Sequence, residues 1–279
     1  MKTLSSYLLA TSLLVSLPSL SSANYQPITP PAEPSANEFS LGVEGFHDRY
    51  REPEIDVTET TDYGSITGGW KHYWPMLNDD KFLVGADVRF STGTDSYKSS
   101  SGTLSGSRQN ELEGRLLTGF QYGHFLGGTL SPYIGFGVRY FVDNGKGEVT
   151  NLGAHAYDRR ITQEYIPIGL TYNYIGEGGW SITPTIEYDP LVYGNVNTRL
   201  QNITGFYNIN NTQNAGSGYG LRGSIMFGFD VHGYDIQAGP FVRYWNINDS
   251  ELTVDPAGTG WIEPKNTRTQ VGAEVKVKW

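Results

Sequence analysis

Long segments of alternating apolar and polar residues constrain the fold of this chain more than any other feature. The last of them runs from Val271 to Trp279, with valine, alanine or tryptophan at every second position and glycine, glutamate or lysine between them. A period of two is typical of a β-strand with one apolar face. About ten such segments follow one another, and most span ~10 residues or more, close to the ~9–11 that a strand needs to cross a bilayer. The pattern predicts an all-β fold, a closed antiparallel transmembrane β-barrel of about ten strands within a range of eight to twelve.

The N-terminal residues carry the features of an export signal. Lys2 precedes the apolar run 8–17, and Ser21, Ser22 and Ala23 form a small-residue cleavage site. Residues 1–23 are therefore predicted to be a signal peptide. Residues 24–37 contain four prolines and are predicted to be a Pro-rich periplasmic linker, and residues 38–279 to be the barrel. No apolar run of ~18 residues follows the signal, so no membrane-spanning helix is expected.

The connections between the predicted strands alternate in length. Four are short, at 75–81, 123–129, 175–179 and 231–233. Five are long and polar, at 50–61, 92–108, 143–159, 190–216 and 248–266. Barrels of the bacterial outer membrane have short periplasmic turns and longer external loops. An even number of strands then places the N- and C-termini in the periplasm and the long loops on the extracellular side.

Aromatic residues gather at both ends of the apolar faces. One predicted girdle, at the end with short turns, comprises Trp74, Phe82, Tyr122, Tyr174, Trp180, Phe229, Tyr234 and Trp279. The other comprises Phe90, Tyr140, Tyr188, Tyr219 and Tyr244. Such belts are typical of the interface between lipid and water. A soluble β-sandwich is the alternative, but it needs neither strands of this length nor aromatic residues at both ends of an apolar face.

The C-terminal strand and its last residue, Trp279, resemble the insertion signal of bacterial outer-membrane proteins. From Phe39 to Trp279 the chain is similar to the small outer-membrane β-barrel families, which include the OmpA-like transmembrane domains. Those domains usually have eight strands, whereas about ten are expected here. The resemblance implies a location in the cell outer membrane and contacts with its lipid and lipopolysaccharide. It also implies recognition of the C-terminal strand by the barrel-assembly machinery.

The polar face of each strand is expected to line the lumen. Its candidates for ion pairs are Glu44, Asp87, Arg89, Glu111, Glu113, Arg115, Arg139, Glu187, Arg222, Arg243, Arg268 and Glu274. An Arg or Lys facing lipid at the bilayer midplane costs ~2–4 kcal/mol, so these side chains must point inward. They either pair and fill a closed lumen or line a narrow aqueous path. About eight strands enclose only side chains and ~16 leave a channel, so about ten strands favour the closed lumen.

Signals for catalysis are poor. The chain has no cysteine, and its net charge of −9 argues against a nucleic-acid partner. Asp230-Val231-His232 resembles the Asp-x-His arrangement of omptin proteases, but it falls in a short turn, whereas an omptin site lies at the outer rim. His47-Asp48 lies at the outer rim without a matching acidic pair. The acidic segment 52–62 lacks the spacing of a calcium loop, so a solvated loop is expected there.

These observations predict an integral outer-membrane barrel with a structural or surface-interaction role and without enzymatic activity, cofactor or metal. A small charge-lined pore for passive, porin-like diffusion is the first alternative, and a surface hydrolase is the second. Residues 190–216 are rich in Asn, Gly and Thr and suit surface recognition, but their composition names no ligand.

Overall fold

The computed structural model describes residues 37–76, 79–203 and 205–279. The predicted signal peptide, 1–23, and residues 24–36 of the predicted linker therefore lie outside the described residues. Asn37, the last residue of that predicted linker, is the first residue of strand β1. In the described part of the chain, no helix has the length and apolar character needed to cross a membrane.

Most of the described residues lie in strands. One sheet contains twelve of them: β1 (Asn37–Glu52), β2 (Val57–Pro75), β3 (Lys81–Ser99), β4 (Gly102–Phe125), β5 (Gly128–Asn144), β6 (Arg159–Tyr165), β7 (Ile168–Ile175), β8 (Trp180–Thr198), β9 (Ile209–Gln213), β10 (Gly218–Val231), β11 (Tyr234–Ile247) and β14 (Asn266–Lys278). Two further strands, β12 (Thr253–Val254) and β13 (Gly260–Trp261), form a separate hairpin. A short 3-10 helix, η2 (Leu200–Asn202), precedes β9.

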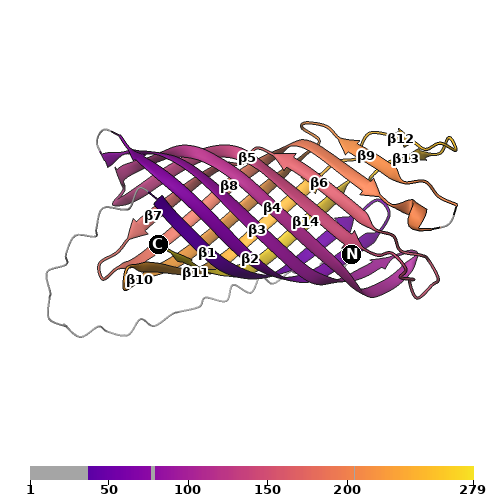
Figure 1. Cartoon of the computed structure of the whole chain (residues 1–279), viewed down its shortest axis with the longest axis horizontal. Helices are drawn as coiled ribbons and strands as arrows, with labels where there is room; N and C mark the ends of the chain where they lie inside the picture. The colour runs from indigo at the N-terminus through magenta and orange to yellow at the C-terminus, as the bar shows by residue number, and fades with distance from the viewer. Residues whose placement is uncertain (1–36, 77–78, 204) are drawn as a thin grey trace, which may run out of the picture. The chain divides into compact units, whose positions relative to one another are not determined.

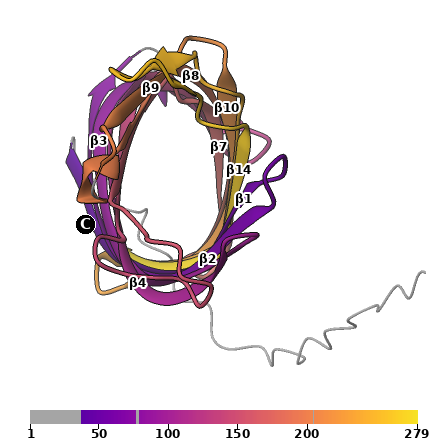
Figure 2. The ribbon, with the colours of Figure 1, turned by 90° about the vertical axis from the view of Figure 1, so that its right-hand side faces the viewer.

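The large sheet closes into a barrel with ten strand positions in the described residues (Figure 2). β6 and β7 share one position, because both pair with β5 and β8, and β9 and β10 share another, because both pair with β8. All neighbours are antiparallel, and β14 pairs with β1 to complete the ring. The break between β6 and β7 falls at Pro167, which has no N–H to donate to the ladder. The predicted closed barrel of about ten strands is confirmed.

The two ends of the barrel differ in their connections (Figure 1). The short-turn end carries the β2–β3, β4–β5, β7–β8 and β10–β11 turns. The long-loop end carries the connections 145–158, 199–217 and 248–265, and the last of these contains the β12–β13 hairpin. At the short-turn end, the Phe39 N–H donates to the Trp279 carbonyl (2.9 Å) and the Trp279 N–H donates to the Phe39 carbonyl (3.1 Å). The first and last strands are thus joined as far as the final residue.

Three of the predicted long loops are wrong over more than half of their length. In the segment 190–216, β8 continues to Thr198 and β9 spans Ile209–Gln213. β1–β2 and β3–β4 are tight hairpins, and their strands extend through most of the segments 50–61 and 92–108. Outward residues there, such as Thr60 and Thr94, are as polar as their inward neighbours. Apolar–polar alternation is therefore absent although the strands continue beyond the apolar part of the barrel.

The outward faces of the strands form an apolar band around the barrel. Leu41, Ile66, Leu116 and Ile186 are aliphatic, yet each is more than half exposed (57, 61, 65 and 66%). A continuous exposed aliphatic surface of this kind fits lipid and is rare on proteins that face only water.

Aromatic rings border this band at the short-turn end. Phe39 and Trp279 stack with ring centroids 6.2 Å apart, and the Tyr174 ring lies 5.5 Å from that of Trp180. The other residues predicted for this girdle are also exposed or half-buried: Trp74, Phe82, Tyr122, Phe229 and Tyr234. Trp74 and Phe82 pack with centroids 5.6 Å apart.

A second row of rings borders the band toward the long-loop end. The Tyr219 ring lies between those of Tyr188 and Tyr244, with centroids 6.1 and 6.4 Å away. Tyrosine joins an apolar ring to a polar hydroxyl, so these positions suit the boundary between lipid and water. The apolar band therefore has an aromatic border on both sides.

Candidate functional site

Two carboxylates on β4 organise the interior of the barrel. Glu111 and Glu113 occupy successive inward positions and are almost fully buried. Arg89 Nη2, on β3, lies 2.6 Å from Glu111 and 2.9 Å from Glu113. Arg139 Nε, on β5, lies 3.3 Å from Glu111, and Arg222 Nη2, on β10, lies 2.5 Å from Glu113. These five side chains are called the central layer below.

Aromatic rings cover the central layer. The Arg139 guanidinium carbon lies 4.4 Å from the ring centroid of Trp245 and 4.6 Å from that of Phe141. The Tyr165 hydroxyl donates to Glu113 (2.5 Å), and its ring packs on Trp245 with centroids 5.2 Å apart. A desolvated cation–π contact is worth ~2 kcal/mol or more. The charged layer and its aromatic cover therefore pack as one unit.

The other predicted lumen charges also face inward and pair. The pairs are Arg243–Glu44 (2.5 Å), Arg115–Asp87 (2.8 Å), Arg115–Glu187 (2.9 Å), Arg268–Asp48 (3.2 Å) and Lys276–Glu274 (3.2 Å). The structure thus gives each of the twelve predicted candidates a partner of opposite charge. An unpaired charge in a dry interior carries a large desolvation cost, so this pairing is what allows so many charges inside one barrel.

Sequence reasoning missed two carboxylates of this network. Asp48 continues the inward face of β1 four residues after Glu44, and Asp189 follows Glu187 by two residues on β8. Arg222 Nε lies 2.6 Å from Asp189 Oδ2. The period of two already places both residues inward. They were missed because loops were expected to begin close to them.

The half of the lumen toward the short-turn end is open. A cavity of about 310 Å³ extends from the central layer toward that end. One wall carries uncharged hydroxyl and amide side chains: Thr129, Ser131, Thr171, Asn173, Thr183 and Thr185. Lys71, Lys276 and Lys278 line another part of the wall. A water molecule in the liquid occupies ~30 Å³, so this half has room for several waters.

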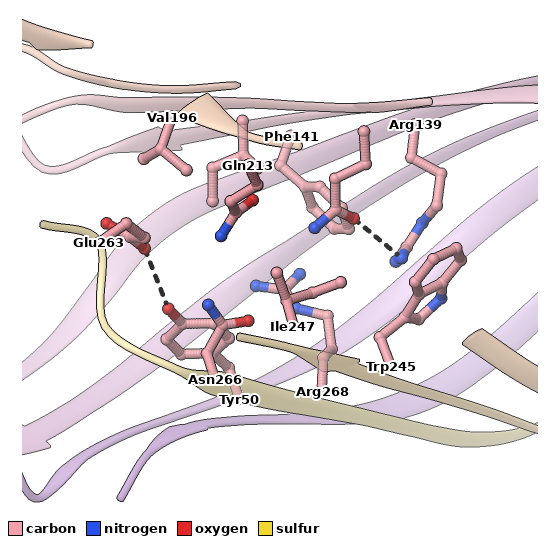
Figure 3. Close-up of a pocket in the computed structure, with 12 residues that line it drawn as sticks. Tyr50, Arg139, Phe141, Val196, Gln213, Trp245, Ile247, Glu263, Asn266 and Arg268 are labelled. Carbon is pink, nitrogen blue, oxygen red and sulfur yellow. Dashed lines mark hydrogen bonds between the residues drawn. The ribbon is translucent and has the colours of Figure 1, made fainter. Parts of the chain in front are cut away.

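The half toward the long-loop end is filled. Two voids between its side chains measure about 20 and 10 Å³, close to the ~10–15 Å³ that a single water needs. A buried apolar cluster lies here, formed by Tyr165, Leu191, Trp245 and Ile247. Figure 3 shows Ile247 and Trp245 beside Arg268 and Arg139, so apolar and guanidinium groups occupy this space together.

The loop 248–265 reaches into the filled half through Glu263. The Glu263 carboxylate pairs with Arg159 on β6 and accepts a hydrogen bond from the Tyr50 hydroxyl (3.4 Å; Figure 3). Glu263 lies in a loop outside the membrane-spanning segments. Burial raises the pKa of Glu263 to about 7, although Arg159 acts in the opposite direction, and the nearby Glu52 adds to the rise. A carboxyl that titrates near neutral pH therefore connects this loop to the lumen.

The acidic segment 52–62 is divided between the two faces of the barrel. Glu52 and Glu59 point inward and are buried, with Arg159 3.6 and 4.0 Å away. Asp62 faces outward and pairs with His47 Nδ1 (2.8 Å). The expected solvated loop is wrong for Glu52 and Glu59, because both lie on strands whose alternation turns them inward. Within the described ranges, no three His, Cys, Asp or Glu side chains are placed to hold a metal ion.

The Asp-x-His segment lies in the β10–β11 turn at the short-turn end. The Asp230 carboxylate accepts a hydrogen bond from the Gly233 N–H (3.3 Å), and His232 has a positive φ of 55°. His47, which pairs with Asp62, has its side chain on the outer surface, where it is 57% exposed. Neither arrangement lies at the mouth of the long-loop end.

Solved structures share this architecture, although no family model and no curated protein sequence matches the chain. The outer-membrane protease OmpT from Escherichia coli is similar with a TM-score of 0.57 and 12% identity, over 88% of this chain and 97% of that chain. The translocator domain of the autotransporter NalP from Neisseria meningitidis gives a TM-score of 0.47 and 11% identity, over 89% and 90%. At such identities the likeness is one of fold. The chain has the fold of the outer-membrane β-barrels.

Proposed function

We propose that this protein is an integral outer-membrane barrel, closed to solutes, whose long-loop end is presented at the cell surface. The filled half of the lumen carries this proposal, because large buried side chains occupy it and two voids between them measure about 20 and 10 Å³. The exposed aliphatic band between two aromatic borders supports the membrane position. The narrower resemblance to OmpA-like domains stays a prediction, since those domains usually have eight strands.

The proposed orientation places the short-turn end, with the end of β14 and the start of β1, in the periplasm. Short turns face the periplasm and longer loops face outward in bacterial outer-membrane barrels. In this orientation the apolar band contacts outer-membrane lipid and lipopolysaccharide. The C-terminal strand β14, which Trp279 follows, is then available to the barrel-assembly machinery during insertion.

Ordered hydrogen bonding at the long-loop end supports a surface-interaction role, which we propose without enzymatic turnover. In the β12–β13 hairpin, the Asp255 carboxylate accepts hydrogen bonds from the Ala257 N–H (2.9 Å) and from Trp261 Nε1 (3.0 Å). The Thr253 hydroxyl donates to the Asn210 carbonyl on β9 (2.8 Å), which ties the hairpin to the barrel. A surface that is already ordered loses less conformational entropy when it binds a partner.

A small pore is the second candidate, and the open half-lumen of about 310 Å³ favours it. Conduction would require the central layer and its aromatic cover to separate. Breaking a buried ion pair by removing one partner costs ~3–5 kcal/mol. The closed barrel is therefore the state that the paired interior supports best.

Reconstitution into planar lipid bilayers tests the closed barrel. The native protein is expected to show no steady conductance. Arg139→Ala combined with Trp245→Ala removes part of the layer and its cover, so this variant is expected to form channels. The matched control is Tyr73→Ala, which enlarges only the open half and should stay silent. Steady single-channel conductance of the native protein would overturn the closed barrel in favour of the pore.

A further inference from the structure

The β4–β5 turn at the short-turn end exposes an unusual amount of apolar surface. Leu126 is 81% exposed, the highest fraction among the large hydrophobic residues of the described chain. Phe125, which precedes it, is 43% exposed. Turns that face water are usually built from Gly, Asn, Asp, Ser or Pro. The side chains of this turn therefore do not match an aqueous setting.

The backbone of Leu126 is also unusual. The described non-glycine residues with positive φ are Asp56, Asp79, His232 and Leu126. Asn, Asp and His are the types enriched in this region, so only Leu126, with a φ of 46°, is out of place. It is followed by Gly127 (φ 80°), and the flanking residues Phe125 and Gly128 pair across the hairpin. Asn-Gly is the preferred sequence at such a two-residue turn.

The turn is continuous with the aromatic border of the lipid-facing surface. Phe125 packs edge-on against Tyr172, with ring centroids 6.4 Å apart, and the Tyr172 hydroxyl donates to the Leu126 carbonyl (2.9 Å). Thr171 and Asn173 line the lumen, so Tyr172 between them faces outward, as does the girdle residue Tyr174. The turn therefore extends the outer surface of the barrel beyond the girdle.

We infer that Leu126, together with Phe125, is an anchor that inserts into the lipid interface of the leaflet at the short-turn end. The partner is the phospholipid interface, where apolar and aromatic side chains gain a favourable environment. Burial of the Leu126 side chain in lipid offsets its unfavourable backbone conformation and explains why a leucine stands where asparagine suits the turn. The inference rests on the membrane position proposed above.

The absence of cysteine from the chain permits a test with single labels. Leu126→Cys, Val275→Cys in the apolar band and Glu177→Cys in the β7–β8 turn are each labelled with an environment-sensitive fluorophore and reconstituted into phospholipid vesicles. Labels at 126 and 275 are expected to show blue-shifted emission and quenching by nitroxide lipids. The label at 177 is expected to be quenched by iodide supplied on both sides of the vesicle.

Comparison of the three sites tests the anchor independently of the membrane position of the barrel. Iodide quenching at 126 as strong as at 177, with lipid quenching retained at 275, would overturn the anchor and leave the barrel in the membrane. A periplasmic protein would then be the remaining occupant for the turn. Iodide quenching at all three sites would overturn the membrane position together with the anchor.

Leu126→Asn distinguishes the lipid contact of the side chain from the strain of the backbone, because the two predict opposite changes in stability. Asparagine suits the positive φ, so it should stabilise a turn that lies in water. For an inserted turn, the midpoint of urea unfolding from vesicles should instead fall, because the apolar contact with lipid is lost. His232→Asn, in the β10–β11 turn, is the matched control and should leave the midpoint unchanged or raise it. An unchanged or raised midpoint for Leu126→Asn would overturn the anchor.

Discussion

The same ten strand positions of the described chain enclose both halves of the lumen, yet one half is open and the other is filled. The open half holds a cavity of about 310 Å³, whereas two voids in the filled half measure about 20 and 10 Å³. Small hydroxyl residues such as Ser131 and Thr171 face the cavity, whereas Tyr165, Leu191 and Trp245 occupy the filled half. The strand number sets the width of the ring, and the size of the inward side chains decides whether that width is closed.

The two halves also stabilise their charges in different ways. Glu113, at the edge of the filled half, contacts Arg89 and Arg222 and accepts a hydrogen bond from Tyr165. Glu274, in the open half, pairs with Lys276, and both side chains keep some contact with solvent (16 and 26% exposed). Water screens the second pair more strongly than the first, because Glu113 and Arg89 are each only 5% exposed although they border the same cavity. Removal of a carboxylate should therefore have unequal consequences in the two halves.

The largest expected effect follows from Glu113→Ala. This change leaves two buried arginines without one of their partners, so the free energy of unfolding should fall by ~3–5 kcal/mol. Glu274→Ala is the matched control in the open half and should cost no more than ~1 kcal/mol. Urea unfolding from lipid vesicles measures both values. Equal losses for the two variants would show that solvent screening does not distinguish the halves.

Trp245→Ala should have the next largest effect. Trp245 is 1% exposed and covers Arg139, so its removal leaves a cavity in the filled half and should cost about 3 kcal/mol. Tyr73→Ala removes an aromatic ring from the wall of the open half, where water can replace it, and should cost less than ~1 kcal/mol. The same unfolding measurement compares them. A large loss for Tyr73→Ala would mean that the open half also depends on tight packing.

The sequence predicts the barrel where one face of a strand meets lipid. Leu41, Val88 and Leu112 alternate with polar residues or glycine because lipid outside and charge inside demand opposite side chains. Beyond the apolar band this contrast disappears. Thr60 faces outward and Glu59 faces inward, and both are polar. This part of the strand therefore shows no apolar–polar alternation in the sequence. The ends of the strands were therefore predicted too early.

The sequence also predicts only part of the candidate site, namely which side chains point into the lumen. The pattern assigns Glu111, Arg139 and Arg222 to the lumen, and the structure brings them into one network. It does not indicate that Glu263, from a loop, reaches Arg159 inside the barrel. It also cannot divide the lumen into halves, because that division depends on which inward side chains meet across the ring. Such contacts join residues far apart in the sequence, and a period of two carries no information about them.

The smallest expected effect concerns the loop that closes the filled half. Burial raises the pKa of Glu263 to about 7 from an ordinary value of 4.5. The folded state therefore binds this proton more tightly than the unfolded state, and the stability that Glu263 contributes falls as the pH rises from about 4.5 to about 7. The loop 248–265 should be better protected from hydrogen exchange at pH 5 than at pH 8. The expected difference is about 2 kcal/mol in the free energy of local opening.

Glu263→Gln tests whether this carboxyl is the source of the pH dependence. Glutamine keeps the shape of the side chain and does not titrate in this range, so the difference in protection between pH 5 and pH 8 should disappear. Glu251→Gln is the matched control, because Glu251 lies in the same loop and contacts Asn214 instead of Arg159. Its difference in protection should equal that of the native protein. A pH dependence that survives Glu263→Gln would mean that another group produces it, and that the closure of the filled half does not depend on the protonation of Glu263.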